Sequence, residues 1–440
     1  MKNYTKDTRE SRSMVAEGRY AGALDTFSLP KTGKGDILVH LERGIILQYM
    51  GEYLKSAHEF ETASSMITAY ENRAVVSAEK TFRQGASLVI NEKALQYRGK
   101  DFEKILIHAF DALDYLMLGN LEDARVEIRQ AYHRQKQLYK KHKKAMEEAG
   151  SGTRGWENAF RDADTAAFER NRIKAARASS VYQNAFAYYI SALVYELNNE
   201  TDEAYIDLKK AIRAAPKCRY IQQDLIRLAK NLGFHEDVSK WQQKYGEYAC
   251  PTKGSIDIFV VLESGSAPFL EDMSLPVPFG KGGISFVSFP VYVFVPQTTS
   301  ACTIRCRGIT ARTGIVCDID ATAARDLMDK LPILFAKQVA RVAVKSQITD
   351  AMGDQFGGIG LLASTVASAV TEQADLRTWS SLPKQIQVAR IHVPENTAYI
   401  TIESVPGLNH RRIDIPGGTK HLIVLVRTAK TGLYIQTKSY

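Results

Sequence analysis

The stretch NETDEAYIDLKKAIRAAP, from Asn199 to Pro216, decides the fold that the sequence predicts. Its small and apolar residues recur at the three- and four-residue spacing of one helix face, after a turn that begins at Asn199. Ala204, Leu208 and Ala211 share that face, and Pro216 ends it. The stretch is therefore predicted to be the second helix of a hairpin, whose small side chains let a neighbouring helix approach closely.

The same pattern recurs at a period of about 34 residues, which is typical of tetratricopeptide repeats, where helical hairpins stack in series. A small residue, replaced by valine in the last copy, opens each second helix, at Ala23, Ser56, Ala124, Ala204 and Val238. The turn before it is marked by Gly18, Gly51, Gly119, Asn199 and Gly233. The spacing leaves room for a degraded copy around Gly85 and for a helical insertion at about 135–180. Residues 1–250 are therefore predicted to form a TPR-like all-α solenoid.

After residue 250 the apolar period changes from 3.6 to 2, which predicts a β-rich domain over residues 251–440. Runs such as SIDIFVVLESG, ISFVSFPVYVFVP and HLIVLVRT are rich in β-branched and aromatic residues. A helical interlude is expected at about 320–371, with Asp320 as its N-cap and a kink or division at Pro332. The predicted fold class is α+β and multidomain, a solenoid followed by a sandwich or mixed sheet with an inserted helical segment.

The first helices of the hairpins predict an apolar inner face. Its candidate partner-binding groove consists of Leu38, Leu41, Tyr49, Leu106, Leu113, Phe186, Tyr189 and Leu193. A groove that grips a carboxylate would carry Lys, Arg and Asn at these positions instead. An open apolar groove also invites aggregation. We therefore expect it to be covered, either by the insertion or second domain of the chain itself or by an apolar segment of a partner.

The densest run of positive charge lies at residues 129–144. Its candidate residues for contact with an acidic partner are Arg134, Lys136, Lys140, Lys141, Lys143 and Lys144. A solvated helix end is the alternative interpretation. The formal net charge of +9 is a modest excess at this length. No nucleic-acid-binding module accompanies the run, so nucleic acid is not expected as a partner.

The sequence lacks the motifs of catalysis, cofactor binding and metal binding. Its 9 histidines form no HExxH motif and no pair with metal-ligand spacing. There is no GxSxG motif, and GKGGIS and FGGIG lack the spacing of phosphate-binding loops. The 5 cysteines are too few for a disulfide framework. We expect neither an enzyme nor a protein that needs a cofactor or metal.

Five segments carry a resemblance to a known family: INEKALQYRGKDFEKILIHAFDALDYLMLGNLEDARVEIRQA, NAFAYYISALVYE, GITARTGIVCDIDATAARDLMDKLP, TEQADLRTWSSLPKQIQVARI and IPGGTKHLIVLVRT. Together they are similar to uncharacterised bacterial outer-membrane lipoproteins with tetratricopeptide repeats and a family-specific C-terminal β domain. The resemblance implies a solenoid tethered, through a lipidated N-terminal cysteine, to the periplasmic side of the outer membrane of a Gram-negative bacterium. This chain has no leader and no lipobox cysteine, so both are expected to precede Met1.

Within the fourth segment, ADLRTWSSLP is expected to form a crossover in the β domain. In that expectation Asp375 pairs with Arg377, Trp379 plugs the sheet, and Pro383 starts the next strand.

The predicted function is that of a non-enzymatic interaction scaffold of the cell envelope. It would assemble with itself, as a homo-oligomer, or with other envelope proteins through TPR-like surfaces, and would touch the membrane only through the lipid anchor. Two alternatives stay open: a cytosolic adaptor that binds peptides in its TPR groove, and a protein that binds acidic cell-wall polymer through its basic surface.

Overall fold

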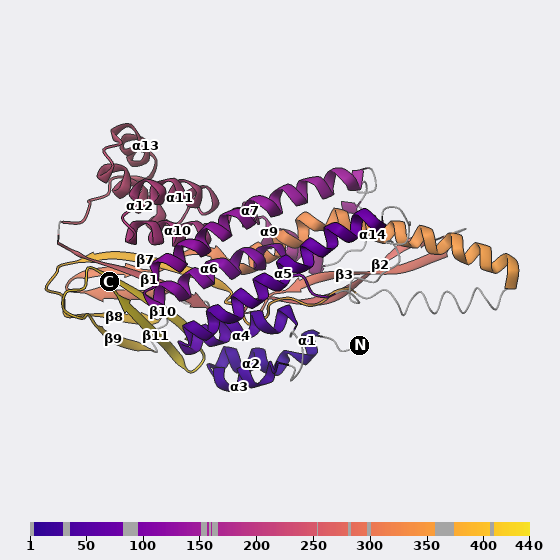
Figure 1. The fold of residues 1–440 in the computed structure, drawn as a ribbon, viewed down its shortest axis with the longest axis horizontal. Helices are drawn as coiled ribbons and strands as arrows, with labels where there is room; N and C mark the ends of the chain where they lie inside the picture. The colour runs from indigo at the N-terminus through magenta and orange to yellow at the C-terminus, as the bar shows by residue number, and fades with distance from the viewer. Residues whose placement is uncertain are drawn as a thin grey trace.

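The computed structural model describes residues 4–29, 36–81, 96–150, 156–157, 160, 166–252, 254–279, 283–296, 301–356, 374–404 and 409–440. It is a mixed α+β structure in which a layer of helices lies along the β-sheets (Figure 1). The degraded repeat expected around Gly85 and the apolar stretch 357–370 lie outside the described residues.

The first half of the chain folds into helices that pair as consecutive hairpins. Its helices are α1 (Tyr4–Asp7), α2 (Arg9–Glu17), α3 (Tyr20–Thr26), α4 (Ile37–Met50), α5 (Tyr53–Thr81), α6 (Asp101–Leu118), α7 (Leu121–Ala149), α9 (Ala166–Ala175), α10 (Ala185–Leu197), α11 (Thr201–Ala214), α12 (Arg219–Asn231) and α13 (His235–Tyr245). The hairpins α4–α5, α6–α7, α10–α11 and α12–α13 pack tightly within themselves, and α5 packs on α6. The chain thus forms a row of stacked helix pairs.

The hairpin turns occur where the sequence predicts them. Gly18, Gly51, Gly119, Asn199 and Gly233 have φ angles of +79°, +81°, +82°, +62° and +72°. Residues with a Cβ rarely adopt this left-handed conformation, and glycine and asparagine are the residues that tolerate it. The predicted turn positions are therefore confirmed.

Small residues lie at the helix crossings within the hairpins. A Cβ added to Gly44 would lie 2.5 Å from Cε1 of Phe60, so the ring occupies the space that a side chain would need. Ser56 is fully buried and donates a hydrogen bond to the Gly44 carbonyl at 2.8 Å. Ala124 and Ala204 are fully buried as well. Close approach of paired helices is thus a direct consequence of these residue choices.

The described residues of the second half form three sheets. Its strands are β1 (Ile256–Ser264), β2 (Phe269–Phe279), β3 (Gly283–Val293), β4 (Cys302–Cys306), β5 (Ile309–Arg312), β6 (Gly314–Asp318), β7 (Gln385–Val393), β8 (Tyr399–Ser404), β9 (His410–Asp414), β10 (His421–Ala429) and β11 (Gly432–Ser439). One sheet has the order β11-β10-β1-β7-β6, with β1 and β10 parallel, and another has the order β5-β4-β8-β9. Strands β2 and β3 form an antiparallel pair by themselves.

The helical interlude is one long helix, α14 (Ile319–Phe356), which runs through Pro332. Of the kink or division predicted at Pro332, the division does not occur, and α14 packs on α9 and β3. Figure 1 shows α14 and the β2–β3 pair extending together away from the other strands. No helix in the described part of the chain is long and apolar enough to cross a membrane.

The predicted N-cap of this helix is also wrong. Asp318 caps the first turn, since its Oδ1 accepts a hydrogen bond from the Ala321 amide at 3.1 Å. Asp320 is fully buried one residue inside the helix. There it forms an ion pair with Lys384, and Lys174 lies 3.3 Å away. The carboxylate that could cap the helix instead joins it to the residue before β7.

Helices and sheets share one apolar core. Side chains from α4, α6 and α10 belong to the same contiguous cluster of buried residues as those from β1, β7 and β10. The last hairpin helix ends at Tyr245 and the first strand begins at Ile256. The change of secondary structure near residue 250 therefore does not separate two cores.

Candidate interaction site

The predicted groove is closed. Its side chains are each at most 4% exposed: Leu38, Leu41, Tyr49, Leu106, Leu113, Phe186, Tyr189 and Leu193. The Tyr189 ring packs on Phe259 of β1, with ring centroids 5.3 Å apart. The Tyr49 hydroxyl donates to the Ser381 carbonyl at 2.9 Å. Of the two coverings that the sequence left open, the structure has the one supplied by the chain's own second half, because burial removes this apolar surface from water. The assignment of these residues to a partner-binding groove is therefore wrong.

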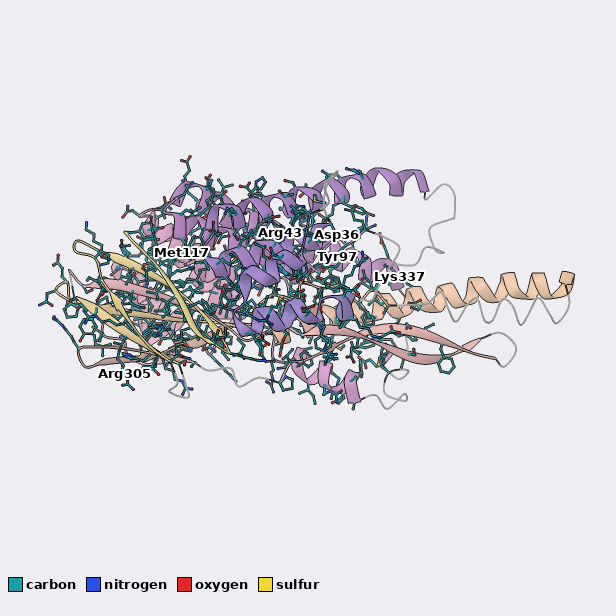
Figure 2. The ribbon with its side chains drawn as sticks, turned by 90° about the horizontal axis from the view of Figure 1, so that it is seen from below. Asp36, Arg43, Tyr97, Met117, Arg305 and Lys337 are labelled. Carbon is teal, nitrogen blue, oxygen red and sulfur yellow. The ribbon has the colours of Figure 1, made fainter. Side chains whose placement is uncertain are left out.

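An extended segment that precedes β7, residues 374–383, crosses the helices, and we call it the strap. Glu103 of α6 holds its middle: Oε1 accepts hydrogen bonds from Thr378 Oγ1 at 2.9 Å and from the Trp379 amide at 2.8 Å. The Tyr97 hydroxyl donates to the same carboxylate, and Arg377 lies over the Tyr97 ring at 5.5 Å. Figure 2 labels Tyr97, which precedes α6, in the middle part of the molecule.

Glu42 of α4 holds the end of the strap. Its Oε1 accepts from both the amide and the hydroxyl of Ser380 at 2.7 Å, and its Oε2 accepts from the Ser381 amide at 2.9 Å and from the Ser381 hydroxyl. The Tyr4 hydroxyl donates to Oε1 at 2.6 Å. Burial raises the pKa of Glu42, although the hydrogen bonds from Ser381 and Tyr4 oppose that rise. A carboxylate with this many donors fixes the strap firmly on the helix.

Trp379, the central side chain of the strap, is 1% exposed. Its ring contacts Phe60 of α5 and Phe110 of α6 edge-on, with centroids 5.6 and 6.0 Å apart. It therefore fills the gap between two helices, and the expectation that it plugs the sheet is wrong. The expected pairing of Asp375 with Arg377 is confirmed, at 2.8 Å.

The last strand, β11, lies against the hairpin turns at Gly18, Gly51 and Gly119. The Tyr434 hydroxyl donates to the Gly18 carbonyl at 3.1 Å, Lys438 Nζ donates to the Leu118 carbonyl at 3.3 Å, and the Tyr440 hydroxyl donates to the Leu116 carbonyl at 2.5 Å. These side chains alternate along the strand, so they all point to one side. The carbonyls at helix ends lack partners within the helix. Lys438 and Tyr440 thus donate to carbonyls in the last turn of α6, and β11 covers the turns at Gly18, Gly51 and Gly119.

A buried ion cluster joins the helices to the sheet at Arg390 of β7. Its guanidinium lies 2.6 Å from Asp257 Oδ2, 2.7 Å from Glu196 Oε1 and 3.2 Å from Asp224 Oδ2. Arg227 of α12 is also buried and pairs with Glu196 and Asp224. Burial raises the pKa of Asp257, but Arg390 together with His421 and His392 outweighs it and holds the pKa well below its usual value. The opposite charges neutralise one another, so the cluster connects the helices to the sheet.

The candidate acidic-partner patch is divided by the structure. Arg134 is 8% exposed, and its guanidinium lies 2.7 Å from Glu71 Oε2 on α5, so its assignment to a surface patch is wrong. The other members of the patch are exposed: Lys136, Lys140, Lys141, Lys143 and Lys144. Two of them have acidic neighbours at 3.7 Å, Lys141 beside Glu71 and Lys144 beside Glu148.

These lysines lie in the second half of α7, where Lys141 is still beside Glu71 of α5. That helix has 29 residues and its hairpin partner α6 has 18, so α7 continues for about 16 Å beyond it. Tyr139 is 56% exposed and Tyr132 is 42% exposed on the same helix. This overhang combines positive charge with aromatic surface.

The described part of the chain was also compared with the geometry of metal sites. Within the described ranges, no group of three or more His, Cys, Asp or Glu side chains is arranged to hold a metal ion.

No family model and no curated protein matches the chain. Among solved structures, the MamA RS-1 ArsTM double mutant is 13% identical and has a TM-score of 0.31, over 56% of this chain and 94% of that one.

Proposed function

We propose that the chain is a non-enzymatic protein-interaction scaffold that binds its partners through outer surfaces of the helical array. The proposal rests on one observation: other parts of the same chain cover the inner face of the helical array. The sheet and the strap fill its inner face, and β11 covers its turns at Gly18, Gly51 and Gly119. A platform closed in this way presents fixed outer surfaces with little freedom to rearrange, and preorganised surfaces lose less entropy on binding.

The overhang of α7 is the surface proposed for such a partner. Lys136, Lys140 and Lys143 form no ion pair with any residue in the described ranges. Exposed tyrosines supply rigid contact area, and unpaired lysines steer an acidic partner during encounter. Arg134, buried against α5, instead anchors the base of this surface.

The proposal places the scaffold in the bacterial cell envelope, on the periplasmic side of the outer membrane. The support for that location is the resemblance to tetratricopeptide-containing lipoproteins. Partners would be other envelope proteins or further copies of the same chain.

A photo-crosslinking amino acid at Lys140 or Lys143 tests this function in cells of the native host. A discrete protein adduct is expected at both positions, and the charge reversals K136E and K144E should reduce it strongly. The same amino acid at Leu54, which is 69% exposed on α5, is the control and should give no such adduct. If all three positions yield only uncrosslinked monomer, the proposed scaffold role is wrong.

A separate measurement addresses the polymer alternative. If the native chain binds purified peptidoglycan, K140E/K141E loses that binding, and no protein adduct forms at Lys143, this surface binds an acidic polymer in place of a protein.

A further inference from the structure

A second basic surface lies at the outer end of the helical array, between α11 and α13. Figure 1 shows these helices at the edge of the helical layer, with α13 outermost. They enclose a cleft of about 580 Å³. Lys209 and Arg213 of α11 and Lys240 and Lys244 of α13 line it, and Trp241 forms part of its floor.

The lining of this cleft carries four cations and one carboxylate, Asp237. None of its four cations forms an ion pair with a residue in the part of the chain that the structure describes. Lys209, Lys240 and Lys244 lie over the rings of Tyr205, Trp241 and Tyr245, at 4.5, 4.8 and 5.2 Å from the ring centroids. Four cations against one carboxylate leave the concavity with a net positive charge, which raises the local potential and attracts an anion.

The floor of the cleft is rigid and aromatic. Trp241 is 8% exposed, and its Nε1 donates to the Tyr205 hydroxyl at 2.8 Å. The Tyr205 hydroxyl donates in turn to Asp237 Oδ2 at 2.6 Å, so the acidic residue of the lining is already engaged. The Tyr245 ring stacks on Trp241 at 5.9 Å with an interplanar angle of 12°. The site is therefore built before any ligand arrives.

The spacing of the cations indicates the shape of the ligand. Lys209 and Arg213 are four residues apart on α11, and Lys240 and Lys244 are four apart on α13. Four residues advance a helix by about 6 Å and return to nearly the same face. In an extended peptide, side chains on one side recur every two residues, about 6.6 to 6.8 Å apart, and the intervening ones point to the other side.

We propose that this cleft binds an extended acidic segment of a partner protein. Alternate carboxylates of the segment reach the cation pair on α11 and the pair on α13. Its backbone and one apolar side chain lie on Trp241 and Tyr245. An inorganic polyanion has no apolar group to use this floor, which is why the geometry favours a peptide. The cleft is a different surface from the α7 overhang, so the proposal goes beyond the scaffold function and does not depend on it.

Fluorescence anisotropy on the full chain tests the proposal. The probe is a labelled eight-residue peptide of alternating Glu and Asp with one central Leu, and the matched probe replaces each acid by its amide. The acidic probe should bind and the amide probe should not. In R213E/K244E, affinity for the acidic probe should fall at least about tenfold, the equivalent of about 1.4 kcal/mol.

The matched control is K136E/K143E on α7, which changes the net charge by the same amount. Its affinity for the probe should fall by no more than about twofold, because charges beyond a Debye length are screened. Circular dichroism checks that both variants keep native helix content. Arg213 and Lys244 are exposed, so no folding defect is expected.

Three results would overturn the proposal. Equal weakening in both variants would mean that net charge or the α7 overhang holds the peptide. Equal binding of the amide probe would remove the role of the carboxylates. Binding of a polyphosphate of equal charge as tightly as the acidic probe would make the cleft a general polyanion site. These results all measure the affinity for a peptide. The scaffold function is tested separately, by crosslinking at α7, so either proposal can fail without the other.

Discussion

Replacing Glu263 by Gln should stabilise the protein at alkaline pH and have little pH-independent effect. Glu263 lies at the end of β1, fully buried and in register with Arg427 on the parallel strand β10. Neither of its carboxylate oxygens has a hydrogen-bond donor among the described residues. The Arg427 guanidinium instead lies over the Tyr49 ring, 4.3 Å from its centroid. Burial raises the pKa of Glu263 to about 7, against a smaller opposing effect of Arg427.

The magnitude follows from proton linkage. A carboxyl whose pKa is higher in the folded than in the unfolded state contributes stability that is fully present below the unfolded pKa. That contribution is lost as the pH rises through the folded pKa. Taking about 4.5 for the unfolded chain and about 7 for the folded protein, the loss is about 3.4 kcal/mol in total, of which about 2.5 kcal/mol falls between about pH 5 and pH 8.5. Gln at this position does not titrate, so the free energy of unfolding of E263Q does not fall in this way as the pH rises.

Urea unfolding followed by circular dichroism, at pH values from about 5 to 8.5, measures the difference in unfolding free energy between E263Q and the native chain. That difference should move in favour of the variant by about 2.5 kcal/mol across the range. Taking a difference cancels the titration of the other groups. If it stays flat, or if the variant loses ground as the pH rises, Glu263 and Arg427 form an ordinary stabilising ion pair and the reasoning is refuted.

Two further predictions concern the contacts between helices and sheets. Trp379→Ala should destabilise the protein by about 3–5 kcal/mol, because it empties a fully enclosed site between two helices, and an undetectable change in urea midpoint would contradict its burial. Arg390→Leu should cost about 3–5 kcal/mol near neutral pH, because it leaves Asp257 among carboxylates with too few cations. Arg390 keeps the pKa of Asp257 low in the folded state, so the stability it provides is lost as pH falls, and the deficit of the variant should shrink in acid. A deficit that grows in acid would mean that Arg390 does not stabilise the ionised form of Asp257.

Most strands could be predicted from period-2 patterns, and the exceptions have a local reason. Strand β2 contains Glu271, Asp272, Pro276 and Pro278, residues that are depleted from strands. It forms only a two-stranded sheet with β3, so it has one pairing partner. Proline is tolerated where a strand has a free edge, since its missing N–H is then not required. Sequence patterns cannot show whether an edge is free.

The buried ions could not be predicted for a different reason. Glu42, Glu103 and Arg390 are charged residues within helices or strands, and such residues are almost never fully buried unless they are paired. The donor on which Glu42 depends, Ser380, lies 338 residues further along the chain. To predict that these charged side chains are buried, one would have to know which distant residues pair with them in the folded chain. One usable signal is the alternation of Tyr434, Gln436, Lys438 and Tyr440, which gives the last strand a polar side facing the helix ends.

The sequence by itself determined the helical hairpins, because left-handed turns at Gly51, Gly119 and Asn199 and small residues at the helix crossings act over short distances. Only the tertiary structure decided what the hairpins hold. Burying the apolar face of the array requires a covering of matching shape. Burying Glu42 and Glu103 requires donors at fixed positions, and the sheets and the strap supply both. The same packing leaves α7 and the α11–α13 cleft exposed, which is why the surfaces proposed for partners lie there.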